Sequence, residues 1–166
     1  KPHSPNFLSS SQTPVTYDPY AISPRISRFI EEIVPDDAQA TLYELMGSLL
    51  VPTVSVQKAF LFVGEGANGK STLCDLIIAM LGISNVSALE LEDLATNNDR
   101  WAAANLYGKL ANIAGDISSE RLTQTAKFKK VVDGGLIKAE RKYGHPFNYR
   151  PYARLVFGIN KMFESA

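Results

Sequence analysis

The sequence predicts an α/β fold in which helices cover a mainly parallel β-sheet, and three observations indicate it. Mainly apolar runs at 59–63, 110–116 and 153–159 have the length and composition of strands covered on both faces. Segments with helical spacing separate these runs, an alternation typical of parallel sheets. A glycine-rich loop directly follows the first run and precedes a helical segment.

Two segments precede the first strand. Residues 1–23 are rich in Ser, Pro and Asn and have no apolar period, which predicts an extended arm or linker. Residues 24–57 form a predicted N-terminal helical segment, because apolar residues recur at helical spacing over 26–33 and again over 38–50. Residues 58–166 then make up the core domain.

Further helices and strands complete the alternation after the first strand. A helix over 70–81 is expected to end at Gly82, since glycine commonly terminates helices. The remaining predicted elements are a strand at 85–89, a helix at 90–106 with a break near 97–98, a helix at 123–132, and a β-hairpin with arms at 137–140 and 146–149.

The composition excludes several classes of protein. With 45% hydrophobic and 20% charged residues and only strand-length apolar stretches, the chain of 166 residues is typical of one globular domain and suggests no membrane role. Its single cysteine, Cys74, excludes a disulfide within the chain and a cysteine-rich zinc site, and favours a reducing, intracellular setting. The net charge is zero, but residues 127–154 carry eight basic against two acidic residues, which predicts a basic face.

The glycine-rich loop matches the pattern G-x-x-x-x-G-K-[S/T] in full, in the expected place between a strand and a helix. Its glycines allow the backbone to curl with N–H groups pointing at phosphate oxygens. The lysine then reaches the β- and γ-phosphates of ATP, and the serine hydroxyl ligates Mg²⁺. A glycine-rich turn that binds nothing is the alternative. The predicted nucleotide-binding residues are Gly64, Gly66, Ala67, Asn68, Gly69, Lys70, Ser71 and Thr72.

Three polar residues complete the predicted catalytic set. Asp116 directly follows a predicted strand and is the natural carboxylate for the Mg²⁺ shell, although it could be an ordinary residue at a strand end. Glu120 is a weaker candidate for the general base, because Ile117 stands where many ATPases have a second acid. Asn160 ends the last strand, where its amide could orient a water or contact the γ-phosphate, or simply form a turn.

The predicted hairpin has a basic and aromatic turn. Arg141, Lys142, Tyr143 and His145 combine cations that meet phosphates with a ring that can lie against a sugar or base, which predicts contact with single-stranded DNA. Lysines on the preceding helix would extend this surface. A solvated face without a ligand is the alternative.

In this order, these features resemble the superfamily 3 helicases, in the phage and plasmid primase-helicase branch related to the poxvirus primase-helicase and the satellite-phage replication proteins. The resemblance covers nearly the whole chain, and its most specific parts are Asn-Gly-Lys-Ser-Thr at 68–72 and Arg-Lys-Tyr at 141–143. Its other carriers are residues 17–19, 24–25, 29–32, 64–67, 112–116, 128–130, 134, 138–140, 146–147 and 154–160.

The resemblance implies a P-loop ATPase of AAA+ type, in which a homo-hexamer couples ATP hydrolysis to translocation on single-stranded DNA. Lys70 and Ser71 correspond to the Walker A contacts, Asp116 to the Walker B acid, and Asn160 to the sensor of the γ-phosphate. A primase domain in the same polypeptide and a cytoplasmic setting in a bacterial host, encoded by a phage, prophage or plasmid, are further expectations.

The resemblance also implies a role for the hairpin, because Lys142 matches the lysine that tracks DNA in the hexamer channel, with Tyr143 beside it.

Three departures from the family pattern are present. Gly135 stands where Asp is common, residues 161–163 lack a frequent proline, and the chain is truncated before the expected arginine finger. Because such an arginine contributes roughly 10³ to 10⁵ in rate, we expect the isolated chain to bind nucleotide and hydrolyse it poorly.

Two other classes of protein compete with this interpretation. A small P-loop kinase would need an acceptor pocket and a mobile lid bearing arginine, and no segment clearly supplies either. A non-catalytic DNA-binding or assembly module would carry a decayed nucleotide site, but the intact Lys70, Ser71 and Asp116 argue against decay.

Overall fold

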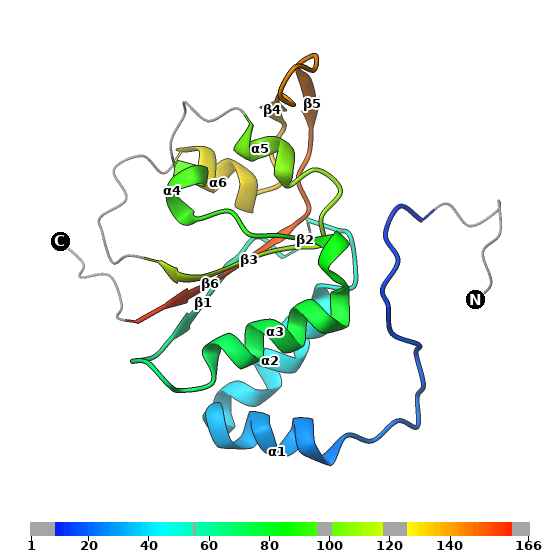
Figure 1. Cartoon of the computed structure of the whole chain (residues 1–166), viewed down its shortest axis with the longest axis vertical. Helices are drawn as coiled ribbons and strands as arrows, with labels where there is room; N and C mark the ends of the chain where they lie inside the picture. Colours follow the sequence, from blue (N-terminus) through cyan, green and yellow to red (C-terminus); the bar gives the residue numbers. More distant parts are fainter. Residues whose placement is uncertain (1–8, 55, 96–100, 118–125, 161–166) are drawn as a thin grey trace.

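A computed structural model gives the fold of residues 9–54, 56–95, 101–117 and 126–160. Four parallel strands form one sheet in the order β1 (Ala59–Val63), β6 (Arg154–Ile159), β3 (Ala111–Ile117) and β2 (Val86–Ser87) (Figure 1). The predicted α/β class with a parallel sheet is therefore confirmed. Strand β6 pairs with a neighbour on both sides, and each of its residues is buried.

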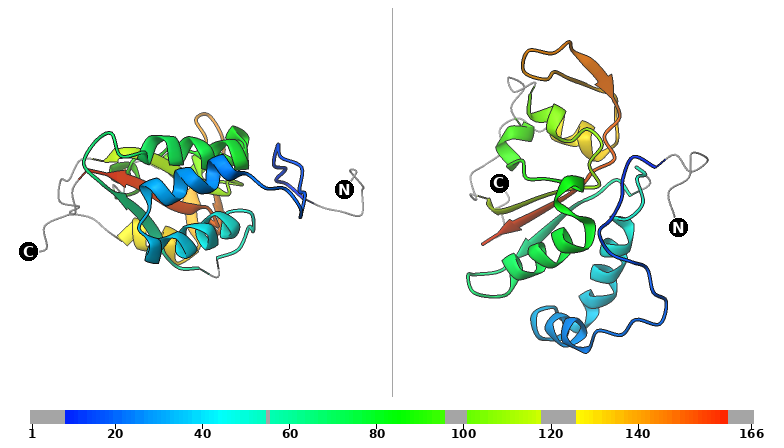
Figure 2. Two further views of the ribbon diagram at one scale, coloured as in Figure 1. Left: turned by 90° about the horizontal axis from the view of Figure 1, so that it is seen from below. Right: turned by 45° about the vertical axis from the view of Figure 1, so that its right-hand side comes forward.

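Helices cover the two faces of the sheet (Figures 1 and 2). One face is packed against α1 (Pro24–Ile33), α2 (Asp36–Ser48) and α3 (Lys70–Leu81), and the other against α4 (Leu91–Ala95), α5 (Ala102–Asn105) and α6 (Ala126–Val132). Because successive side chains of a strand point to opposite faces, β6 contributes to both cores. Val156 packs on the α1–α3 side, and Leu155, Phe157 and Ile159 pack on the α4–α6 side.

Strand β1 differs from the sequence prediction. Its run of apolar residues predicted a strand covered on both faces, but β1 lies at the edge of the sheet in the part of the chain that the structure describes. Leu61 is 38% exposed and Val63 is 47% exposed. An apolar composition indicates that a strand can be buried, but it gives no information about the order of the strands. The prediction that β1 is covered on both faces was therefore wrong.

Strand β2 is shorter than predicted because a side chain replaces part of its pairing. Asn112 on β3 is fully buried, and its Oδ1 accepts hydrogen bonds from the Leu89 N–H (2.8 Å) and the Ser87 hydroxyl (2.9 Å). Its Nδ2 donates to the Leu89 carbonyl at 2.9 Å. The backbone of Leu89 is therefore held by an amide side chain where the ladder between β2 and β3 ends.

The predicted hairpin is present as a separate antiparallel pair, β4 (Ile137–Ala139) and β5 (Phe147–Tyr149). It projects beyond the end of the main sheet, at the top of Figure 1. A short 3₁₀ helix, η1 (Ile83–Asn85), follows α3. The segment 9–23 contains no helix or strand, and its Gln12 carbonyl accepts a hydrogen bond from the Asn85 side chain at 2.8 Å. Within the described ranges, no helix is long and apolar enough to cross a membrane.

Candidate functional site

The glycine-rich loop connects β1 to α3 and is anchored to β6. The N–H of Gly64 donates to the carbonyl of Ile159 at 3.1 Å, so the loop begins at the carboxyl end of β6. Ala67 (φ +55°) and Gly69 (φ +82°) adopt left-handed backbone conformations, which curl the loop back toward the helix. Among the described residues, no side chain caps the N-terminus of α3, so the first N–H groups of this 12-residue helix have no side-chain acceptor there.

Lys70, the first residue of α3, donates hydrogen bonds to oxygens of the loop and of the residue that follows β6. Its ammonium donates to the Gly64 carbonyl, to Asn68 Oδ1 at 3.2 Å and to Asn160 Oδ1 at 3.3 Å. Asn160 directly follows β6 and lies 90 residues from Lys70 in the sequence. The structure thus brings together two residues that were predicted separately. All three acceptors are neutral.

A hollow of about 220 Å³ lies beside the loop, between α3 and the carboxyl ends of β3 and β6. In open parallel sheets, ligands bind outside the carboxyl ends of the strands. Ser71 and Asp75 project into it from successive turns of α3. Asp75 was not predicted, although its spacing of four residues from Ser71 places both on one helix face. The full lining consists of Lys70, Ser71, Cys74, Asp75, Ile78, Ile113, Gly115 and Gly158.

The backbone of Asp116 lies next to this hollow. It belongs to β3 and follows Gly115, which lines the hollow. The pairing of β3 with β6 shifts between Ala114 and Ile117, so β3 has one extra residue at this point. Such bulges occur frequently beside functional sites, where they redirect the chain. Glu120, the predicted general base, lies outside the described residues.

The predicted DNA-binding residues lie together on the turn between β4 and β5. All four are exposed, and the Gly144 N–H closes the turn by donating to the Arg141 carbonyl at 2.8 Å. Tyr143 has a left-handed backbone (φ +64°) and is 97% exposed. The Lys142 ammonium lies 5.5 Å from the centre of the Tyr143 ring. This geometry presents a cation and an aromatic face outward at the same point.

Arg141 has a different environment from its neighbours on the turn. Its guanidinium lies 5.9 Å from the ring centre of Tyr107 and 5.8 Å from that of Phe147. The Tyr107 ring also meets Phe147 edge-on, with the ring centres 5.2 Å apart. Arg141 therefore packs against rings of its own chain and fixes the hairpin to the segment after α5.

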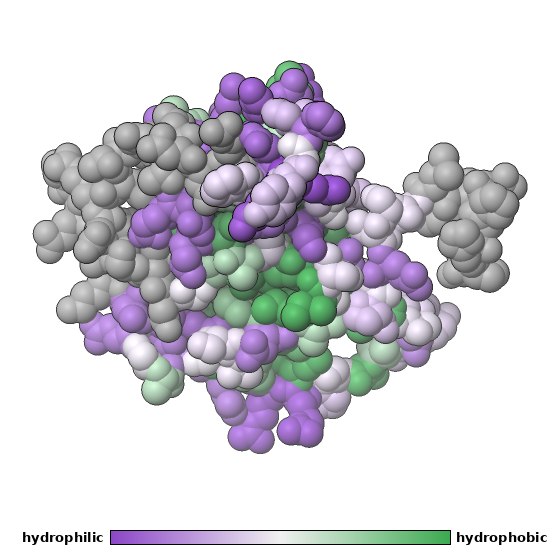
Figure 3. All heavy atoms as spheres, turned by 45° about the horizontal axis from the view of Figure 1, so that its top comes forward, coloured by the Kyte–Doolittle hydropathy of each residue, from purple (hydrophilic) through white to green (hydrophobic). Residues whose placement is uncertain are grey.

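The hairpin and the glycine-rich loop lie at different ends of the molecule, with the loop at the lower left of Figure 1 and the hairpin at the top. Hydrophilic residues cover much of the hairpin end in the space-filling view, with an apolar area below them (Figure 3). Lys129 and Lys130 on α6 are exposed and belong to the basic segment of the sequence. Any ligand of the hairpin is thus separate from any ligand of the loop.

Comparison with solved structures agrees with the class of the fold, a parallel sheet flanked by helices. The A form apo structure of the NrS-1 C-terminal region has a TM-score of 0.63 and 17% identity, covering 82% of this chain and 33% of that one. The apo structure of NrS-1 residues 305–718 has a TM-score of 0.62 and 15% identity, with the same coverage. The chain therefore spans about a third of the length of these structures.

Comparison of the sequence with family models assigns the chain to a family, which the structural comparison alone does not do. Residues 62–166 match the family of unknown function DUF5906, and the chain belongs to that family. The matched segment begins within β1 and includes the glycine-rich loop, β3, the hairpin and β6. No curated protein matches the chain.

Proposed function

We propose that this chain is the motor core of an ATP-dependent DNA helicase of the superfamily 3 type, acting in phage or plasmid replication. The observation that carries the proposal is the contact of Lys70 with Asn160 at the mouth of the phosphate loop. Lys70 begins α3, and Asn160 directly follows β6, the parallel strand next to β1. Their side chains meet where the terminal phosphate of ATP would bind.

The loop favours a phosphate ligand for two physical reasons. The uncapped N-terminus of α3 offers N–H donors and the positive end of the helix dipole. Lys70 bonds only neutral oxygens among the described residues, and hydrogen bonds to charged oxygens are roughly twice as strong. Phosphate oxygens would therefore replace these acceptors with a gain in free energy.

The residues around the hollow also fit Mg²⁺. The described residues contain no cluster of three or more His, Cys, Asp or Glu side chains, and Mg²⁺ needs none, because it is commonly held by one or two carboxylates, water and substrate phosphates. Ser71 and Asp75 line the hollow, and Asp116 is next to it in sequence and in β3. These three residues would hold the ion, which when bound neutralises charge on the phosphates.

The hairpin is the proposed contact with single-stranded DNA. Lys142 would meet a backbone phosphate while the exposed ring of Tyr143 stacks on a base or sugar, with His145 adding a polar contact nearby. Arg141 holds the hairpin in place through its stacking on Tyr107 and Phe147. In a homo-hexamer, six such turns would face the strand, and the next subunit would supply the arginine that completes each ATP site.

Binding of a fluorescent ATP analogue to the chain, with Mg²⁺ present, tests the nucleotide site. Loss of a hydrogen bond to a charged group is worth roughly 1.5–3 kcal/mol, so Lys70→Ala should weaken binding about 10- to 100-fold. Lys138→Ala removes an exposed lysine of β4 and serves as the matched control, with unchanged affinity expected. Equal affinity of Lys70→Ala and wild type would exclude the assignment of the loop.

A second titration tests the DNA site with a labelled single-stranded oligonucleotide, with and without a non-hydrolysable ATP analogue. Lys142→Ala and Tyr143→Ala should each weaken binding, the latter by roughly 1–3 kcal/mol if its ring stacks on a base. Lys58→Ala removes an exposed lysine outside the hairpin and serves as the control, with unchanged DNA binding expected. Binding of both hairpin variants as tight as wild type would exclude the hairpin. Phosphoryl transfer to small acceptors, without any response to DNA, would favour the kinase alternative.

A further inference from the structure

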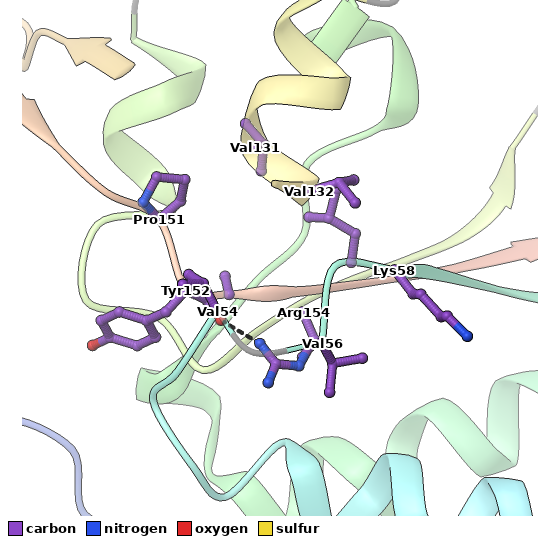
Figure 4. Close-up of a pocket in the computed structure, with 10 residues that line it drawn as sticks. Val54, Val56, Lys58, Val131, Val132, Pro151, Tyr152 and Arg154 are labelled. Carbon is purple, nitrogen blue, oxygen red and sulfur yellow. Dashed lines mark hydrogen bonds between the residues drawn. The ribbon is translucent and has the colours of Figure 1, made fainter. Parts of the chain in front are cut away.

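The two ends of β6 differ in the space beside them. At its start, Arg154 is 4% exposed, and its Nη1 donates to the carbonyl of Tyr152 at 3.3 Å (Figure 4). The hollow that these residues help to line leaves about 10 Å³, enough for about one water. The hollow at the other end, beside the glycine-rich loop, measures about 220 Å³. Of the two, only the larger hollow has room for part of a nucleotide.

Gly115 of β3 lines the larger hollow and is exposed. Ile113, two residues earlier, lines the same hollow and packs on the α1–α3 side of the sheet. Because residues two apart in a strand share a face, a side chain at position 115 would point toward the hollow. Gly158 of the neighbouring strand β6 also lines the hollow. The sheet therefore presents bare backbone where these two glycines lie.

The fold itself does not explain a glycine at position 115. Glycine inside a strand weakens it relative to alanine, and it is commonly retained for a left-handed φ or for the close approach of another backbone or a ligand. The φ of Gly115 is not left-handed, so the bulge at this point does not require glycine. A Cβ at this position would meet nothing within 4 Å among the described residues. A ligand that approaches the backbone is the reason that remains.

The neighbours of Gly115 indicate which part of a ligand would lie there. Lys70 and Ser71 line the same hollow, and in the G-x-x-x-x-G-K-[S/T] pattern they serve the β- and γ-phosphates and Mg²⁺. The backbone N–H groups of such a loop hold the α- and β-phosphates. Asn160, whose Oδ1 accepts a hydrogen bond from Lys70 at 3.3 Å, follows β6 at the same edge of the sheet. The hollow thus lies on the side where a third phosphate would extend beyond the second.

We propose that Gly115 is a specificity-determining residue, which lets the site accept a nucleoside triphosphate in preference to a diphosphate. The proposal rests on the nucleotide site proposed above and adds the property that distinguishes ATP from ADP there. The missing side chain at position 115 leaves space for the γ-phosphate, and a methyl group would occupy part of that space. A diphosphate ends before this point, so its binding does not depend on residue 115.

The first measurement uses the chain without nucleotide, and the variant is Gly115→Ala. The matched control is Gly47→Ala, at an exposed glycine of α2 where a Cβ also meets nothing within 4 Å. Alanine is favoured over glycine inside both kinds of element, so each variant should raise the melting temperature by about 1–4 °C. This result would show that the fold does not need the glycine at position 115.

The second measurement compares the binding of a non-hydrolysable ATP analogue and of ADP, each labelled on the ribose, with Mg²⁺ present. Adding a methylene to a filled space costs enough to weaken ATP binding by Gly115→Ala about 5- to 100-fold. The affinity of this variant for ADP should stay within about twofold of wild type. Gly47→Ala should bind both nucleotides as wild type does.

Three results would overturn the role of Gly115. The first is a Gly115→Ala chain that melts at a lower temperature than wild type or does not fold, since the fold would then require the glycine. The second is unchanged affinity for the ATP analogue, and the third is an equal loss of affinity for both nucleotides. Each of these leaves the nucleotide site itself in place. A wild-type chain that binds neither nucleotide would instead exclude the proposed function, and the role of Gly115 with it.

Discussion

Asn112 allows a quantitative test of how the sheet is held together. The change is Asn112→Ala, which removes three buried hydrogen bonds of 2.8–2.9 Å to Ser87 and Leu89. A net contribution of about 1 kcal/mol for each bond predicts a loss of about 3 kcal/mol in the free energy of unfolding. For a chain of this size, that loss lowers the melting temperature by roughly 6–12 °C.

The assay is urea unfolding followed by circular dichroism, with thermal unfolding as the second measure. Asn112→Leu keeps the number and branching of the side-chain heavy atoms without the polar atoms, so it should also be destabilised because Leu89 N–H and C=O stay buried and unpaired. Asn148→Ala, at an exposed position on β5, should stay within about 0.5 kcal/mol of wild type. A loss below about 1 kcal/mol in Asn112→Ala would contradict the assignment of these bonds.

Three further predictions concern the backbone, the hairpin and pH. Gly134→Ala should destabilise more than Gly108→Ala in urea unfolding, because both have left-handed φ but a Cβ at Gly134 would lie 2.5 Å from Val54 Cγ1, while one at Gly108 meets nothing within 4 Å. Arg141→Ala should speed hydrogen exchange of the hairpin amides about tenfold through loss of its two ring contacts, whereas Lys142→Ala should not; equal rates would contradict the stacking. Burial and the nearby acids raise the pKa of Glu90, so its ionised form is disfavoured in the folded state. Glu90→Gln should be more stable than wild type at pH 7, and this difference should vanish below the unfolded pKa near 4; a difference that is constant with pH would refute it.

The sequence predicted the elements of the core better than their arrangement. The bounds of β1 and α3 agree with the apolar run and helical pattern at 59–63 and 70–81. The edge position of β1 could not be predicted, because periodicity reports the environment of a side chain and not the order of strands. The short β2 was also missed, since the pairing of Leu89 with a side chain on β3 depends on contacts between distant segments.

In the candidate sites, too, local sequence predicted individual residues, whereas environments set by distant segments were not predicted. The loop pattern made Lys70 and Ser71 candidate site residues, and the strand end made Asn160 one, because each prediction depends on local sequence. Nothing local shows that Arg154, in a basic segment, is a buried residue at the start of β6. The different environments of Arg141 and Lys142 are likewise set by Tyr107, far away in sequence.

Strand β6 has a mechanical consequence for the molecule. It is hydrogen-bonded to β1 and β3 on its two sides, has Asn160 at one end, and is separated from hairpin strand β5 by only four residues at the other. Sliding β6 along its own axis would break two ladders at once. A displacement of Asn160 along the strand axis is therefore expected to move the sheet as a rigid body. Because the hairpin is joined to β6 by a short connection, it would move with the sheet.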